Sequence, residues 1–256
     1  MIIDTNVNLS RWPFRRLAGD EPADLVSKLR KSNVQQAWAG SFDALFHKDL
    51  AGANTRLAED CRMHGQGLLL PFGSINPKLP EWQDDLRRCH QEHKMPGIRL
   101  HPNYHGYSLR DPAFTELLKL AAARNLIVQL ALCMEDERTQ HPLVRVPPVD
   151  FTPLGDLLAV QPGLRVVILN CYPQVNWSQL QQLATAENVY FELGMVEGVG
   201  GVARLVERVS LERVVFGSHY PLFYFESAWL KMQESGLAEK ERSAILHENA
   251  RRLVAP

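Results

Sequence analysis

The sequence has little cysteine and no excess of charge of either sign, and both absences narrow its function. Its cysteines, Cys61, Cys89, Cys133 and Cys171, lie too far apart for a CxxC zinc or redox motif, and the chain is too long to need disulfide staples. With 28 Lys and Arg against 29 Asp and Glu the formal charge is −1. A nucleic acid or an anionic membrane held by bulk charge is therefore not an expected partner.

The sequence shows no long apolar run and no internal linker. The N-terminal Met1–Asp4 reaches a charged residue at once and reads as a strand, so we expect neither a signal peptide nor a membrane span there. No low-complexity or Gly/Ser/Pro-rich stretch divides the 256 residues. This length suits one β/α barrel or two small domains. We expect one domain over residues 1–256, in a reduced, cytoplasmic protein.

Short apolar runs alternate with segments of helical period along the whole chain. Proline in a first turn opens several of these segments, as in Glu21-Pro22, Leu79-Pro80 and Asp111-Pro112. The apolar runs are rich in Val, Ile, Leu and Phe, as in strands buried on both faces. They are Ile2–Asn8, Val34–Ser41, Gly67–Ile75, Gly97–His101, Leu126–Leu132, Leu164–Cys171, Val189–Gly194 and Arg213–Ser218.

These eight strand–helix units without a hairpin signal predict a parallel sheet that closes on itself. An open doubly wound sheet is the alternative, and it would normally carry a glycine-rich phosphate loop after its first strand. Neither GxGxxG nor GxxxxGK[ST] occurs. The predicted fold class is α/β, a single (β/α)8 TIM-type barrel, whose chemistry lies at the C-terminal ends of the strands.

Several of these segments, taken in order, resemble the amidohydrolase-related branch of the amidohydrolase superfamily. The resemblance covers almost the whole chain, from an opening strand of the pattern Ile-Asp-x-His-x-His to the closing helix. The matching segments are Ile2–Asn8, Gly97–Pro102, Asp111–Pro112, Asn125–Val128, Pro162–Leu169, Asn188–Leu193, Val215–Pro221 and Ile245–Leu253. The resemblance implies a barrel that acts on a small molecule, either by hydrolysing a C–O or C–N bond or by decarboxylation.

The sequence departs from this family where metal-using members hold their metals. Those members take two His from the first strand, one His each from the fifth and sixth, and an Asp from the eighth. The aligned positions here are Asn6, Asn8, Ala131, Cys171 and His219. Asn and Ala do not replace imidazole on zinc, so we expect neither a metal nor another cofactor.

A replacement metal site remains an open alternative, although no motif spacing supports it. Its ligands would come from His101, Glu135, Glu192 and His219.

Asn6 and Asn8 share one face of the first strand with Asp4, because side chains alternate along a strand. They are either a hydrogen-bonded amide pair left in a former metal cavity or substrate ligands. His219 and Cys171 end two strands separated by one strand. They are a nucleophile with its base, or an inert buried thiol beside a histidine that acts alone as base or ligand.

Arg99 and His101 face the same way on the fourth strand, and Gln129 ends the fifth. Arg99 at a barrel mouth suits an anionic substrate through bidentate hydrogen bonds. Its alternative is a structural ion pair with Glu192 or another internal carboxylate.

Two charged loops overhang the predicted mouth. Arg11–Arg16 follows the first strand and contributes Trp12 and Arg15, while Glu135–His141 follows the fifth and contributes Glu135 and Arg138. Each loop is either a solvated charge run or part of the substrate site.

The resulting hypothesis is an amidohydrolase-related hydrolase that acts on a small carbonyl-bearing or anionic substrate. The family includes a pyrone-dicarboxylate lactonase that looks able to work without a metal. His219 would then be the base, with Arg99, Asn6 and Asn8 as donors. The alternative is a catalytically inactive barrel that binds a ligand or a protein partner. A homo-oligomer remains open.

Overall fold

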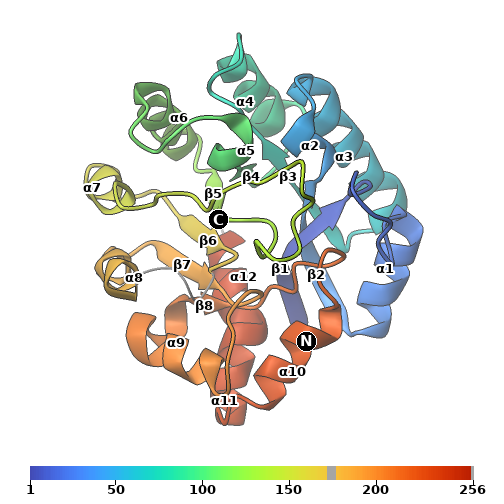
Figure 1. The fold of residues 1–256 in the computed structure, drawn as a ribbon, viewed down its shortest axis with the longest axis vertical. Coiled ribbons are helices and arrows are strands. Elements are labelled where there is room, and N and C mark those ends of the chain that lie inside the picture. The colour runs from blue at the N-terminus through green and yellow to red at the C-terminus, as the bar shows by residue number, and fades with distance from the viewer. Residues whose placement is uncertain (172–176, 255–256) are drawn as a thin grey trace.

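The computed structural model describes residues 1–171 and 177–254, and their strands form one parallel sheet in sequence order (Figure 1). Backbone hydrogen bonds from Thr5 N to Phe216 O and from Asn8 N to Tyr220 O, both 2.9 Å, join the two ends of the sheet. The strands are β1 (Ile2–Leu9), β2 (Val34–Ser41), β3 (Leu69–Ser74), β4 (Gly97–Leu100), β5 (Ile127–Ala131), β6 (Val166–Leu169), β7 (Val189–Glu192) and β8 (Val214–Val215). The predicted barrel is confirmed.

The helices ring the strands on the outside (Figure 1). Two short helices lie in loops, α2 (Asp43–Phe46) and α5 (Pro102–His105). The others are α1 (Pro22–Lys31), α3 (Leu50–Gly65), α4 (Trp82–Gln91), α6 (Pro112–Ala123), α7 (Leu154–Ala159), α8 (Trp177–Ala184), α9 (Gly201–Val209), α10 (Phe225–Gln233), α11 (Glu239–Ser243) and α12 (Asn249–Val254). No helix in the described part of the chain is both long and apolar enough to cross a membrane.

Local sequence accounts for several helix boundaries. Pro22 and Pro112 open their helices as expected, and the Asp111 side chain accepts a hydrogen bond from Ala113 N. The expected start at Pro80 is displaced, because Glu81 takes a left-handed conformation and α4 begins at Trp82.

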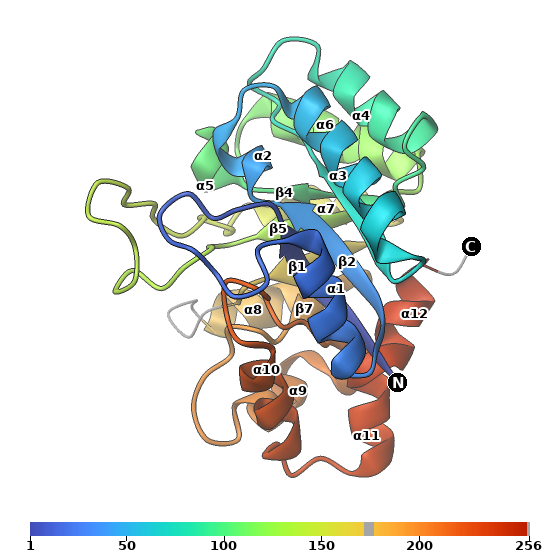
Figure 2. The same ribbon diagram turned by 90° about the vertical axis from the view of Figure 1, so that its right-hand side faces the viewer.

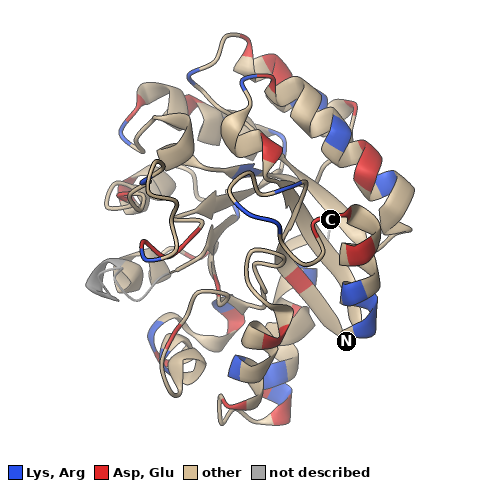
Figure 3. Cartoon of the chain, turned by 45° about the vertical axis from the view of Figure 1, so that its right-hand side comes forward, with Lys and Arg blue, Asp and Glu red and all other residues tan. Residues whose placement is uncertain are grey.

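Apolar side chains fill the space between barrel and helices, and a second cluster extends from the end where the strands begin to Trp12 and Phe42 in the loops at the opposite end. Where the strands begin, α12 packs Ala250 and Leu253 with Ile3 and Val215. The opposite end carries the loops after β1 and β5, which project side by side on the left of Figure 2. Acidic and basic residues are interspersed over the outer helices (Figure 3), as the balanced charge implies.

Candidate active site at the barrel mouth

An arginine side chain is buried inside the barrel, and its hydrogen-bond donors are all used by protein acceptors. Arg99 of β4 is 1% exposed, and all five of its N–H groups donate to protein oxygens. The acceptors are Gln129 Oε1, Val7 O and Asn8 Oδ1 at 2.8 Å, Trp38 O at 2.9 Å and Thr5 O at 3.5 Å. No N–H remains for a substrate anion, so this geometry gives the expected clamp no support.

The local backbone explains why Arg99 fits there. Asp4 pairs with Ala37 but Val7 with Ala39, so β1 has one residue more than β2 and a bulge between them. Near this bulge Arg99 donates to three strand carbonyls, those of Thr5, Val7 and Trp38. Gly40 makes room, because a Cβ there would lie 2.7 Å from Arg99 Nη1. Burial lowers the pKa of Arg99 to about 9.

Glu192 ends β7 and is fully buried, but it does not pair with Arg99. Its carboxylate accepts hydrogen bonds from Asn170 N at 3.0 Å, from Asn6 Nδ2 at 3.3 Å and from Gly194 N. Asn6 Nδ2 also donates to Asn170 Oδ1 at 2.8 Å. Burial raises the pKa of Glu192. The hypothesis of an Arg99–Glu192 ion pair is wrong, because backbone and amide donors already surround the carboxylate.

Asp4 of β1 is hydrogen-bonded to the segment that follows β8. It accepts from Ser218 N at 2.9 Å, from Ser218 Oγ at 2.5 Å and from Asn6 N at 3.1 Å. Burial raises its pKa to about 7, against these hydrogen bonds. We call the following saturated set the inner polar layer: Asp4, Asn6, Arg99, Gln129, Asn170, Glu192 and Ser218.

Nearer the mouth, buried polar atoms have no protein partner. They are Asn8 Nδ2, Trp12 Nε1, His101 Nδ1 and His219 Nδ1, and we call these four residues the mouth set. Each is 3% exposed or less. Asn8 N bonds to Tyr220 O, so Asn8 and His219 stand on neighbouring segments of the closed barrel. Such atoms are rare in folded proteins, and a catalytic role, a bound water or a ligand can account for them.

His219 has a defined tautomer, with a left-handed backbone (φ 57°). Its Nε2 lies 2.8 Å from Met134 O. A carbonyl can only accept, so Nε2 carries the proton and Nδ1 presents a lone pair. Burial lowers the pKa of His219 to about 4, and burial also holds the pKa of His101 well below its ordinary value. Both rings are therefore neutral near pH 7.

Cys171, expected beside His219, is a buried thiol. Burial raises its pKa well above the ordinary value, which leaves the unreactive protonated form. His219 contacts Met134 O through one ring nitrogen and has no partner on the other. The contact that a thiolate–imidazole pair requires is therefore missing.

Trp12 of the mouth set belongs to an aromatic cluster of loop residues, which we call the lid. Trp12 makes edge contacts with Phe14 (5.6 Å), Phe42 (5.1 Å) and Phe46 (5.7 Å), and Phe46 meets Tyr104 at 5.6 Å between ring centroids. These rings come from the segments after β1, β2 and β4.

Ion pairs hold the charged residues expected at the mouth. Arg15 pairs with the buried Glu135 carboxylate, which ties the loop after β1 to the loop after β5. Arg138 pairs with Asp136 in its own loop and stays 77% exposed. The structure therefore holds Arg15 and Glu135 between these two loops and leaves Arg138 on the surface.

The residues present do not fit a two-metal site. Asn6 donates its amide to Asn170 and Glu192, and Asn8 Oδ1 faces the Arg99 guanidinium. Within residues 1–171 and 177–254, no three His, Cys, Asp or Glu side chains are grouped as a metal would need. The replacement site drawn from His101, Glu135, Glu192 and His219 gains no support from this arrangement.

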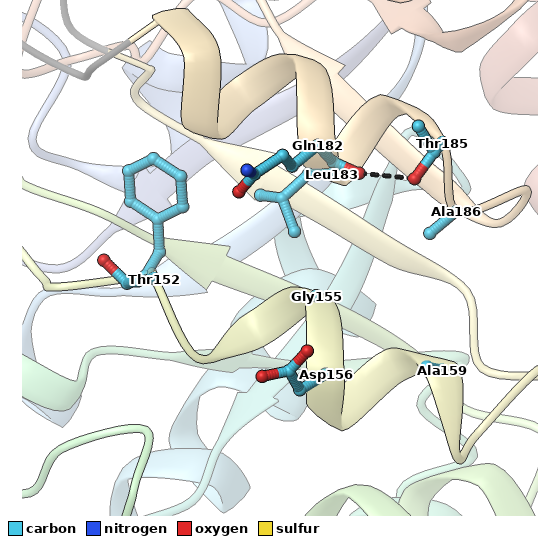
Figure 4. A pocket seen from close by; sticks show the side chains of 9 residues that line it. Thr152, Gly155, Asp156, Ala159, Gln182, Leu183, Thr185 and Ala186 are labelled. Carbon is cyan, nitrogen blue, oxygen red and sulfur yellow. Dashed lines mark hydrogen bonds between the residues drawn. The ribbon is translucent and has the colours of Figure 1, made fainter.

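A groove outside the barrel lies between α7 and α8 (Figure 4). It has a volume of 630 Å³ and shares no residue with the mouth set. Asp156 and Gln182 project from its two helices, and Thr185 Oγ1 donates to Gln182 O at 2.6 Å. Its lining contains no histidine, cysteine, lysine or arginine, so the mouth is the better candidate for chemistry.

Comparison with known proteins agrees with the fold. A model of the family described as Amidohydrolase matches residues 7–255, and no curated protein matches the chain. The 5-carboxyvanillate decarboxylase of Sphingomonas paucimobilis superposes with a TM-score of 0.76 at 12% identity, covering 99% of this chain and 98% of its own.

Two further structures cover the same shares of both chains, 99% and 98%. A probable 2-pyrone-4,6-dicarboxylic acid hydrolase of Acinetobacter baumannii, with citric acid bound, has a TM-score of 0.67 at 14% identity. Amidohydrolase 2 of Bifidobacterium longum subsp. infantis has a TM-score of 0.68 at 19% identity.

Proposed function

The chain belongs to the Amidohydrolase family, and on this premise we propose that it is an enzyme whose chemistry takes place at the barrel mouth. The proposed reaction is hydrolysis of a C–O or C–N bond, or decarboxylation, of a small carbonyl-bearing molecule. One observation carries the proposal. Asn8 Nδ2 and His219 Nδ1 are a buried donor and a buried acceptor without protein partners on neighbouring segments.

The proposed mechanism uses this pair directly. His219 Nδ1 accepts a proton from a water whose oxygen bonds to the substrate carbonyl carbon, because Met134 O holds the other ring nitrogen protonated. The protonated ring then returns this proton to the leaving oxygen or nitrogen as the C–O or C–N bond breaks. Asn8 Nδ2 and Trp12 Nε1 donate to the substrate carbonyl oxygen as negative charge develops on it. Arg99 fixes the Asn8 amide by donating to Oδ1, so that Nδ2 needs no reorganisation during the reaction.

Substitution of His219 tests the proposal. We expect His219→Gln to lower turnover by about 10²–10⁴-fold, the usual contribution of a general base, in a panel of lactones, amides and aromatic carboxylates. His64→Gln is the matched control, since His64 lies on α3 outside the barrel. Equal turnover by both variants would remove His219 from the mechanism.

The metal prediction has its own test. The replaced donor set leads us to expect no stoichiometric zinc, manganese or iron in the purified protein, and an unchanged Tm with a chelator. Metal analysis together with melts checks both expectations. Stoichiometric metal that His219→Gln or Cys171→Ser releases would contradict them.

A barrel that binds a ligand without turnover is the second candidate. Burial lowers the pKa of His219 to about 4, which makes its neutral ring a weak base and favours this reading. Tight binding at the mouth with no turnover in the panel would establish it.

A further inference from the structure

We infer that the ligand group that enters the barrel mouth is an uncharged carbonyl with a neighbouring hydroxyl or N–H, and not a carboxylate. The inference rests on the proposed function, since it requires a ligand at the mouth set, and it narrows the proposed reaction to hydrolysis, because decarboxylation would need a carboxylate there. It departs from the sequence-based expectation of an anion held by Arg99.

Among the residues that the structure describes, no Lys or Arg at the mouth is free to meet an anion. Arg99 is the one Lys or Arg that is buried in the described ranges. Its N–H groups all donate to oxygens of the protein. A carboxylate in the mouth would have to take one of these donors and leave a buried carbonyl or amide oxygen unbonded, which is unfavourable.

The other nearby cations are also engaged. Arg15 pairs with the buried Glu135 carboxylate. Lys231 donates to Gly194 O at 2.5 Å, and its ammonium group interacts electrostatically with Glu192. Each positive charge is therefore committed to a protein acceptor, and a ligand anion would compete with it.

The titratable groups around the mouth add no positive charge at neutral pH. The depressed pKa of both His101 and His219 keeps these rings neutral. Glu192 is buried below them, and Asp4 adds further negative charge above its pKa of about 7. A buried carboxylate without a counter-charge is strongly disfavoured.

The unpartnered atoms match an uncharged group instead. Asn8 Nδ2 and Trp12 Nε1 can only donate, so they complement a carbonyl oxygen. His219 Nδ1 can only accept in its fixed tautomer, so it complements a hydroxyl or an N–H. A buried site with these atoms rejects a ligand that lacks either partner, because its own polar atoms then stay unbonded.

Salicylamide and salicylate test the inference, since they share a ring and an ortho hydroxyl and differ in the charge of the third group. Calorimetry at neutral pH with the full chain should show salicylamide binding at least about tenfold more tightly. Asn8→Leu should remove most of this affinity, and His64→Gln should leave it unchanged. Because Asn8→Leu also removes the Oδ1 acceptor of Arg99, Trp12→Phe, which removes no protein hydrogen bond, should weaken binding several-fold as a second variant.

The outcomes separate this inference from the proposed function. Salicylate binding as tightly as salicylamide, with Asn8→Leu weakening both, would overturn the inference and leave the mouth as a site. If neither salicylate nor salicylamide binds, nor the smaller pair glycolamide and glycolate, the inference and the mouth site both fail. Selective binding of salicylamide that Asn8→Leu does not change would also overturn it.

Discussion

Two sets of buried polar groups lie one above the other in this barrel. They are equally buried, but they differ in whether their side-chain nitrogens and oxygens have hydrogen-bond partners. In the inner polar layer no buried side-chain nitrogen or oxygen lacks a hydrogen-bond partner, and Arg99 alone makes five bonds. In the mouth set each of the four residues has one unpartnered atom. Both sets are 3% exposed or less.

This difference separates structural groups from ligand-binding groups. A fully satisfied network rigidifies the barrel, and its loss costs stability. An unpartnered buried atom contributes nothing to the fold, so its replacement by an apolar group costs little. Mutations in the inner polar layer should therefore change stability first, and mutations in the mouth set should change ligand binding first.

The largest expected effect belongs to Arg99→Met. It removes the donors to the carbonyls of Val7 and Trp38 and to two amide oxygens inside the barrel, while Thr5 O keeps Gln129 Nε2 as a donor at 2.7 Å. We expect a loss of about 5 kcal/mol or more in the free energy of unfolding. Chemical denaturation measures it, with His64→Gln as the control. A variant that is as stable as the wild type but binds ligands more weakly would show that Arg99 acts in ligand binding.

The second prediction concerns Asp4 and pH. Its folded pKa of about 7 lies above the unfolded value of 3.8, so the folded state binds the extra proton between these values. The stability that this provides is full below about pH 4 and is lost as the pH rises through 7.

Asp4→Asn removes that titration. The stability of the wild type relative to Asp4→Asn should therefore fall between pH 4 and 7, by on the order of 4 kcal/mol. Denaturation series of both proteins over this range measure the difference. A difference that stays flat would show that Asp4 keeps an ordinary pKa in the fold.

Gly40→Ala tests the room that Arg99 needs. The added Cβ would lie 2.7 Å from Arg99 Nη1 and 2.9 Å from Cδ, and we expect about 1–3 kcal/mol of destabilisation from overpacking. Gly155→Ala on α7 is the matched control, since its Cβ would meet nothing within 4 Å and alanine favours a helix. Equal stability of the two variants would mean that Arg99 moves aside freely.

Trp12→Phe should change stability least. The lost Nε1 has no protein partner and a ring remains for the lid, so we expect a change within about 1 kcal/mol but several-fold weaker binding of salicylamide. Trp38→Phe is the contrast, because Trp38 Nε1 donates to Gln36 Oε1 and the ring stacks on Phe72. It should lose stability and keep binding.

The sequence predicted the barrel because eight apolar runs and a missing phosphate loop admit few folds. It also predicted that Arg99 and His101 face inward, since period two fixes the face of a strand. The acceptors of Arg99 were out of reach, because the bulge between Asp4 and Val7 is set by strand pairing across the barrel. The Met134 carbonyl beside His219 was missed because every residue carries a backbone carbonyl.

The central claim is that ligands bind at the mouth set, and a crystal structure with salicylamide bound tests it most directly. We predict the ring at the mouth set, with its carbonyl oxygen at roughly 2.7–3.2 Å from Asn8 Nδ2 and its hydroxyl at a similar distance from His219 Nδ1. Salicylamide bound in the groove between α7 and α8, with the mouth set untouched, would contradict the claim.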